Sequence, residues 1–188
     1  MEALIIIFFV VLFLAVLGVA GFSSPDDERE QVSGQAETAS GDLHKVKVRH
    51  IIDGDTVIVS KSWSEIRVRL SAIDCPEDGQ HWGNVAKAGL IKLIGGRHVH
   101  IETHGIDAHG RTLATIYVNF GSKLINVNER MVMLGHAWVM RQYWDHLPKS
   151  RQYQLNRLEQ WARSKRVGLW KTDNPIPPWR WRKQSQSR

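Results

Sequence analysis

The chain has 188 residues, a single cysteine and a formal net charge of +6 at pH 7. One cysteine excludes an intramolecular disulfide, so the stability of the fold must come from core packing. The basic balance favours polyanionic partners, either nucleic acid or anionic lipid headgroups.

The N-terminal segment, residues 3–22, contains no charged, amide or hydroxyl side chain. A helix of this length spans roughly 30 Å, which is enough to cross the apolar core of a bilayer. The segment is therefore predicted to be a transmembrane or signal helix that contacts the membrane. Only Glu2 precedes it, without the positive charge usual in a signal peptide, and this favours a retained anchor. Gly18-Val19-Ala20 nevertheless suits a cleavage site, so both alternatives stay open.

Three further regions follow the apolar segment. Residues 23–43 lack a periodic apolar pattern and are predicted to form a solvated, disordered linker. Residues 44–172 have a length that suits one domain. Residues 173–188 form a basic tail rich in tryptophan and arginine, with Trp179-Arg180-Trp181-Arg182-Lys183 at its centre. Such a tail suits contact with nucleic acid or a membrane surface, and equally suits packing of its tryptophans on the domain.

Alternating apolar and polar residues predict short strands, of which the first two form a hairpin around the turn Asp53-Gly54-Asp55. The expected strands are 45–52, 56–59, 66–73, 98–103, 112–118 and 136–140. Apolar residues at helical spacing, ended by glycine in two cases, predict three helices. The expected helices are 86–94, 126–134 and 150–165. The early strands lack crossover helices, so a five-stranded barrel of the oligonucleotide-binding (OB) type is expected, in an α+β chain that is mainly β.

Acidic side chains are expected at the ends of neighbouring strands of this barrel. Asp55 starts the second strand and Asp74 ends the third, so the two carboxylates can share one cation. Calcium and magnesium both take oxygen ligands, and calcium also accepts backbone carbonyls. Cys75 can therefore contribute its backbone carbonyl to the site. Its thiol is a poor nucleophile, because the neighbouring acids raise a thiol pKa.

Three further residues complete a pattern suited to phosphodiester chemistry. Glu77 lies just past the turn, where a carboxylate can orient or deprotonate a water molecule for attack on phosphorus. Arg69 and Arg111 can hold the phosphate oxygens and stabilise the charge of the transition state. Each of these features alone would suit surface acids and arginines at turns, whereas their joint order and spacing indicate a catalytic site.

The same residues make the chain resemble the staphylococcal nuclease (thermonuclease) family over roughly residues 46–170. The resemblance is carried by five motifs in family order: Ile52-Asp53-Gly54-Asp55-Thr56; Arg69-Leu70-x-x-x-Asp74-x-Pro76-Glu77; Gly110-Arg111-x-Leu113-Ala114; the helix 126–134 with Gly135-x-Ala137; and Gly168-Leu169-Trp170.

The resemblance implies an OB-fold barrel with three helices and a calcium-dependent endonuclease. It implies cleavage of the P–O5′ bond in both DNA and RNA, leaving 3′-phosphate ends. By the same resemblance, Asp55, Asp74 and the Cys75 carbonyl surround Ca²⁺, Glu77 is the general base, and Arg69 and Arg111 clamp the phosphate.

Two positions depart from the family pattern. His109 stands where the family has a tyrosine before Gly-Arg, and the tyrosines that pack on the terminal nucleotide have no clean match in residues 140–144. Tyr143 and Trp144 are the candidates for stacking on a base. Base preference is therefore open, whereas the metal and arginine positions are intact.

The expected localisation is membrane-anchored with the catalytic domain extracytoplasmic, or secreted if the leader is cleaved. Arg29, the only basic residue close to the apolar segment, favours the opposite orientation, but the nuclease function favours export. The sequence indicates a monomer and no protein partner. The alternative function is an OB-fold module that binds nucleic acid without cutting it. Such a binder would not require all five of Asp55, Asp74, Glu77, Arg69 and Arg111.

Overall fold

The computed structural model describes residues 42–186. The expected membrane segment 3–22 and nearly all of the linker 23–43 lie outside these residues. Within the described part, no helix combines the length and the apolar character needed to cross a membrane.

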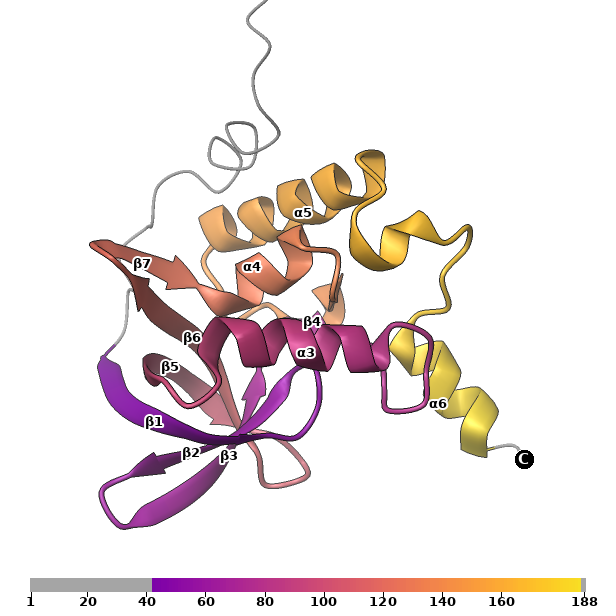
Figure 1. The fold of residues 1–188 in the computed structure, drawn as a ribbon. Coiled ribbons are helices and arrows are strands. Elements are labelled where there is room, and N and C mark those ends of the chain that lie inside the picture. Colours follow the sequence, from indigo (N-terminus) through magenta and orange to yellow (C-terminus); the bar gives the residue numbers. More distant parts are fainter. Residues whose placement is uncertain (1–41, 187–188) are drawn as a thin grey trace, which may run out of the picture. The chain divides into compact units, whose positions relative to one another are not determined.

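Five strands close into a barrel (Figure 1). They are β1 (Leu43–Ile51), β2 (Thr56–Lys61), β3 (Ser64–Leu70), β5 (His98–Ile106) and β6 (Thr112–Phe120). Neighbouring strands run antiparallel in the order β3-β2-β1-β5-β6, and a parallel pairing of β3 with β6 closes the ring. The predicted five-stranded barrel is thereby confirmed. A further strand, β7 (Lys123–Asn126), pairs with β6 outside the ring.

Two very short strands pair beside the barrel. They are β4 (Ile73–Asp74) and β8 (Trp138–Val139), which run antiparallel so that Asp74 lies opposite Trp138. The predicted strand 66–73 is interrupted because Ala72 has a φ of 60°. This left-handed conformation turns the chain out of β3 and into β4, and it brings Asp74 to the barrel end where Asp55 lies.

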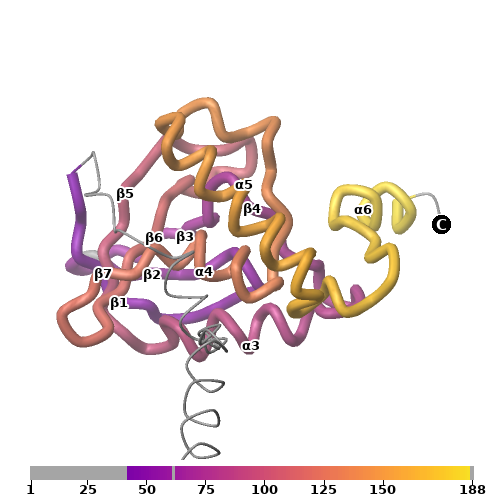
Figure 2. Tube along the Cα trace, turned by 90° about the horizontal axis from the view of Figure 1, so that it is seen from above, coloured from indigo at the N-terminus to yellow at the C-terminus, as the bar shows by residue number. Residues whose placement is uncertain are grey.

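Four α-helices surround the barrel in the described part. They are α3 (Gly83–Ile94), α4 (Val127–Met133), α5 (Lys149–Ser164) and α6 (Pro178–Gln186), with short 3₁₀ turns at η1 (Arg141–Tyr143) and η2 (Gly168–Lys171). The first three match the predicted helices. α4 packs on β6 and against both α3 and α5. The view from above shows α4 beside these two helices (Figure 2). α6 lies within the segment predicted as a basic tail.

Alternate residues of the barrel strands fill its interior. Val46, Val48, Val57, Val59 and Val68 are each at most 2% exposed, as the period-two pattern of a half-buried strand requires. A second apolar cluster joins the C-terminal elements to β8, and it consists of Trp138, Ala162, Leu169 and Trp170 with Trp82, Trp161 and Val167 packed against it.

Two glycines hold this second cluster at a fixed distance from α4. Gly135 and Gly168 both have positive φ, 64° and 62°. A Cβ atom on Gly135 would lie 2.2 Å from the carbonyl oxygen of Val167, and one on Gly168 would lie 2.3 Å from that of Gly135. The backbones therefore touch at a point where only glycine fits.

Candidate active site

The turn between β1 and β2 positions the first carboxylate. Asp53 caps the turn, because its Oδ1 accepts a hydrogen bond of 2.9 Å from the backbone N–H of Asp55. A Cβ atom on Gly54 would lie 2.7 Å from the Cβ of Cys75. Only glycine therefore lets the turn lie against the chain that follows β4. As a result, Oδ2 of Asp55 accepts a 2.7 Å hydrogen bond from the backbone N–H of Cys75.

Arg69 joins the two buried carboxylates from the end of β3. Its Nη2 lies 2.7 Å from Oδ1 of Asp74, and its Nη1 lies 3.2 Å from Oδ2 of Asp55. Nη1 also donates to the carbonyls of Leu70 and Ile73, both at 2.9 Å. The guanidinium therefore shapes the chain reversal between β3 and β4 as well as the site. Its side chain is only 13% exposed.

Burial controls the protonation of this cluster. Burial raises the pKa of Asp55 to about 7, although the Arg69 guanidinium acts in the opposite direction. Burial also raises the pKa of the Cys75 thiol, and the Asp55 charge adds to this effect. The thiol donates to the carbonyl of Gly54 at 3.2 Å. Cys75 thus packs and hydrogen-bonds as a neutral thiol, in keeping with its exclusion as a nucleophile.

Glu77 follows in a turn that Gln80 stabilises. The backbone N–H of Glu77 donates to Oε1 of Gln80 at 3.0 Å, and the backbone N–H of Gln80 donates to the carbonyl of Glu77 at 3.0 Å. The amide of Gln80 reaches across to the carbonyl of Ile176 at 2.7 Å. Gln80, which sequence reasoning missed, therefore links the turn of Glu77 to the segment that leads into α6.

Arg111 lies just before β6, the strand that pairs with β3. The turn that precedes it is held by Asp107, whose Oδ1 accepts from the backbone N–H groups of His109 and Arg111, both at 2.9 Å. Oδ2 of Asp107 lies 2.8 Å from Nε and 2.7 Å from Nη2 of Arg111. Leu113 pairs with Arg69 in the parallel ladder. Arg69 therefore lies on one of the two strands that close the barrel, and Arg111 directly precedes the other. Asp107 is a second residue to which the sequence pattern assigned no role in the site.

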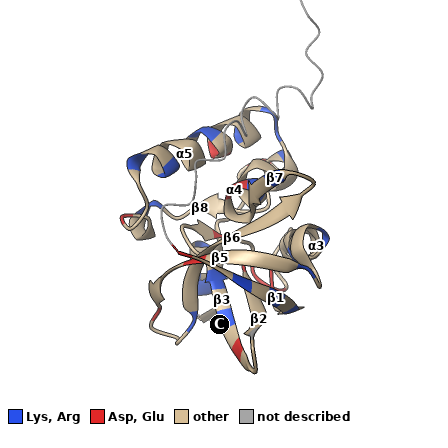
Figure 3. Ribbon diagram, turned by 90° about the vertical axis from the view of Figure 1, so that its left-hand side faces the viewer, with Lys and Arg blue, Asp and Glu red and all other residues tan. Residues whose placement is uncertain are grey.

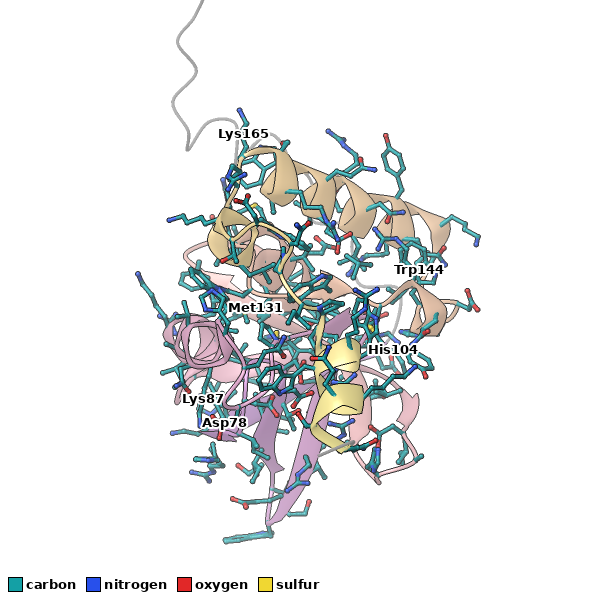
Figure 4. The ribbon with its side chains drawn as sticks, turned by 90° about the vertical axis from the view of Figure 1, so that its right-hand side faces the viewer. Asp78, Lys87, His104, Met131, Trp144 and Lys165 are labelled. Atoms are coloured by element: carbon teal, nitrogen blue, oxygen red, sulfur yellow. The ribbon has the colours of Figure 1, made fainter. Side chains whose placement is uncertain are left out.

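Arg182, on α6, is the third missed residue, and it contacts two of the predicted site acids. Its Nη2 lies 2.9 Å from Oδ2 of Asp74, and its Nη1 contacts Oδ1 of Asp74 and Oε1 of Glu77. In Figure 4, α6 crosses in front of the barrel, with the labelled Asp78 on one side and His104 on the other. The sequence separation of more than one hundred residues left no local signal for this contact.

Tyr143 and Trp144 follow β8, the strand paired with the Asp74 strand. Tyr143 is 65% exposed, and the Trp144 ring lies 5.8 Å from the Arg141 guanidinium carbon. The structure thus places two partly exposed aromatic rings after the strand that flanks the site. Lys and Arg positions also occur along β3 and α5, where the ribbon of Figure 3 is blue.

The donor set suits a hard divalent cation. Asp55 and Asp74 offer carboxylate oxygens, which calcium and magnesium prefer, and both side chains are withdrawn from solvent. Among residues 42–186, however, no group of three or more His, Cys, Asp or Glu side chains is arranged for immediate metal binding. Guanidinium nitrogens of Arg69 and Arg182 occupy positions against the carboxylate oxygens.

Comparisons with known proteins agree on one family. The model of staphylococcal nuclease homologues matches residues 67–172. A protein named ParB from Escherichia coli is 40% identical over 147 residues, which cover 76% of this chain and 81% of that protein. A micrococcal nuclease from Shigella flexneri is 37% identical over 146 residues, covering 75% and 82%. A protein from Escherichia coli named as an uncharacterized endonuclease is 37% identical over 141 residues, covering 75% and 86%.

Proposed function

The chain belongs to the staphylococcal nuclease family and is an endonuclease, a phosphodiester hydrolase, and from this premise we propose that its reaction depends on calcium and cleaves both DNA and RNA. The products we propose are 3′-phosphate ends, formed by cleavage of the P–O5′ bond. The observation that carries the proposal is the convergence of Asp55, Asp74 and Glu77 at one end of the barrel. Arg69 links Asp55 to Asp74, and Arg182 links Asp74 to Glu77. Two of these carboxylates suit a cation, and the third suits a general base.

Asp55 and Asp74 would hold the cation, together with the backbone carbonyl of Cys75. A bound divalent cation supplies positive charge beside the phosphate oxygens. Burial of Asp55 supports this role, because its raised pKa marks a carboxylate that lacks enough compensating positive charge. A cation at this position would compensate the charge of the two acids.

Glu77 would take a proton from the attacking water molecule. Its side chain is 35% exposed, so a water molecule can reach it. Arg111, which directly precedes β6, would bind phosphate oxygens. Asp107 would fix the orientation of its guanidinium. Arg69 would contribute its charge to the same phosphate while it keeps the β3–β4 reversal in place. Tyr143 and Trp144 would stack on bases next to the scissile bond.

We propose that residues 3–22 attach the enzyme to a membrane with its catalytic domain outside the cytoplasm, or direct its secretion if they are removed. A protein in such a position meets extracellular nucleic acid rather than the chromosome. The proposal also makes the enzyme a monomer, since one chain supplies every residue assigned to the site.

The test is degradation of single-stranded DNA and RNA by the purified full-length protein with calcium, with magnesium and with a chelator. We expect degradation with calcium and none with the chelator. Glu77→Gln should lose the activity while it still binds the substrate, and Asp78→Asn, which changes the exposed neighbouring acid, should cut normally. Undiminished activity in the chelator would contradict the metal requirement. Equal loss of cutting and binding in Glu77→Gln would argue against a general base.

A further inference from the structure

The guanidinium of Arg182 covers both oxygens of the Asp74 carboxylate. Nη2 lies 2.9 Å from Oδ2, and Nη1 lies 3.3 Å from Oδ1, while Nη1 also donates to Glu77. Oδ1 of Asp74 further accepts from Arg69 at 2.7 Å, and the Asp74 side chain is only 2% exposed. Both oxygens of this buried acid are therefore engaged by arginine nitrogens.

This arrangement is incompatible with a cation on the same acid. Calcium binds carboxylate oxygens at about 2.3–2.6 Å, in the space that a hydrogen-bonded guanidinium nitrogen fills. The two positive charges would also repel each other strongly at such a distance in a site withdrawn from water. Arg182 and a divalent cation can thus be bound to Asp74 only one at a time.

α6 is held in this position by contacts at its first turn and through Arg182. Its first residue, Pro178, is buried, and the Trp179 ring lies 6.4 Å edge-on from the Trp138 ring. The amide of Gln80 holds the preceding segment through the carbonyl of Ile176. α6 has nine residues, and isolated helices shorter than about 12–15 residues are marginal in water. The ion pairs of Arg182 therefore contribute to keeping α6 docked and ordered.

We propose that α6 is an autoinhibitory latch, in which Arg182 occupies Asp74 and Glu77 and excludes calcium until the helix undocks. The inference rests on the proposed calcium site. α6 contains three basic residues and no acid, so once released it can bind the phosphates of a nucleic-acid strand. The substrate itself thereby favours the open form of the enzyme.

The latch lowers the apparent affinity for calcium by the fraction of molecules in which α6 is undocked. If α6 is docked in about nine molecules of ten, its release strengthens calcium binding about tenfold. Arg182→Gln removes the charge while it keeps a polar side chain of similar reach. Arg180→Gln makes the same change two residues earlier on the same helix, at an exposed position, and is the matched control.

The experiment is calorimetric titration of calcium into the full-length wild-type protein, Arg182→Gln and Arg180→Gln, without nucleic acid. We expect Arg182→Gln to bind calcium about tenfold more tightly than the other two. Equal or weaker binding by Arg182→Gln would overturn the latch and leave the proposed nuclease mechanism intact. Failure of all three proteins to bind calcium would overturn the proposed metal, and the latch together with it.

Hydrogen exchange of the wild-type protein gives a second measurement that needs no variant to fold. Without calcium, the backbone amides of α6 should be protected, and saturating calcium should speed their exchange. The amides of α5, which packs on α4, should be unaffected and serve as the internal reference. If calcium binds and α6 keeps its protection, the latch does not exist.

Discussion

At the scale of single residues, Asp107 fixes the orientation of Arg111, the residue that we propose binds phosphate. It binds two backbone N–H groups of the turn and two nitrogens of the guanidinium. Asp107→Asn keeps an acceptor for the backbone but loses the charge that fixes the guanidinium. We expect kcat to fall about 10–100-fold, as for other residues that orient a functional group.

The measurement is steady-state cleavage of single-stranded DNA, with Tm recorded for the same samples. Asp145→Asn, a change at an exposed acid in another loop, should leave kcat unchanged. Asp107→Glu should restore part of the lost rate, because it returns the charge. A fall in Tm that matches the loss of rate would instead mean that Asp107 only stabilises the turn.

Single residues also mark where sequence reasoning ends. The types and spacing of Asp55, Asp74 and Glu77 were enough to predict a group of acids. Those of Arg111 were enough to predict an arginine that binds phosphate. The partners of Arg69 were not predictable, because its nitrogens bind carbonyls that reach it only after the chain reverses at Ala72. Replacement of Arg69 by alanine would therefore disturb the fold as well as the chemistry.

At the scale of elements, one amide attaches α4 to the barrel. Oδ1 of Asn128 accepts from the backbone N–H of Ile116, and Nδ2 donates to the carbonyls of Ser71 and Ala114 at 3.0 and 3.2 Å. These groups are buried, so removal of the amide leaves them without their partner. We expect Asn128→Ala to lower the free energy of unfolding by about 3 kcal/mol.

Urea unfolding at equilibrium measures this change. Asn119 lies on β6, the strand of Ile116, and its side chain is exposed. Asn119→Ala should change stability by less than about 0.5 kcal/mol. Similar losses in the two variants would show that the buried hydrogen bonds of Asn128 contribute little.

His136, which follows α4 in the chain and lies against Gly89 of α3, makes the stability of the protein depend on pH. Burial lowers the pKa of His136 from 6.5 to about 4, and its Nδ1 accepts from the Trp82 indole at 3.1 Å. Below pH 6.5 the unfolded chain takes up a proton at this residue that the folded chain, with its lower pKa, does not. Stability is therefore lost as the pH falls, by about 2 kcal/mol between pH 7 and 5.

Urea unfolding of the wild-type protein and His136→Leu at these two pH values tests the effect. The leucine variant should lose about 2 kcal/mol less than the wild type on acidification. Asp55, whose pKa is raised and which acts with the opposite sign, is common to both proteins and cancels in the comparison. An identical pH dependence in the two proteins would exclude His136 as its source.

The elements themselves were predictable where they carry a strong apolar period. The strands of the barrel and the helices α3, α4 and α5 follow from alternation or helical spacing. β7 has only four residues, and α6 has no apolar face of its own, so neither gave such a pattern. α6 forms on contacts with β8, Gln80 and the site acids, and these depend on the assembled fold.

At the scale of the whole molecule, residues 42–186 contain a closed barrel, its helices and the complete set of proposed site residues. We therefore expect a fragment of residues 42–188 to have the same Tm and nuclease activity as the full-length chain, with both proteins measured in the same detergent. Calorimetry and cleavage of DNA in solution provide the measurement. A clear drop in Tm on removal of residues 1–41 would show that the N-terminal region contributes to the fold of the nuclease domain.

The tight contact between Gly54 and Cys75 allows local opening of this part of the protein to be measured by labelling of the cysteine. The chain has a single thiol, which is 3% exposed and whose raised pKa keeps it protonated. A thiol-specific dye can therefore label it only while a local opening exposes the sulfur atom. The labelling rate of the wild-type protein thus measures how often the proposed catalytic site opens. Each ligand that binds there should slow the labelling, and the experiment requires no mutation.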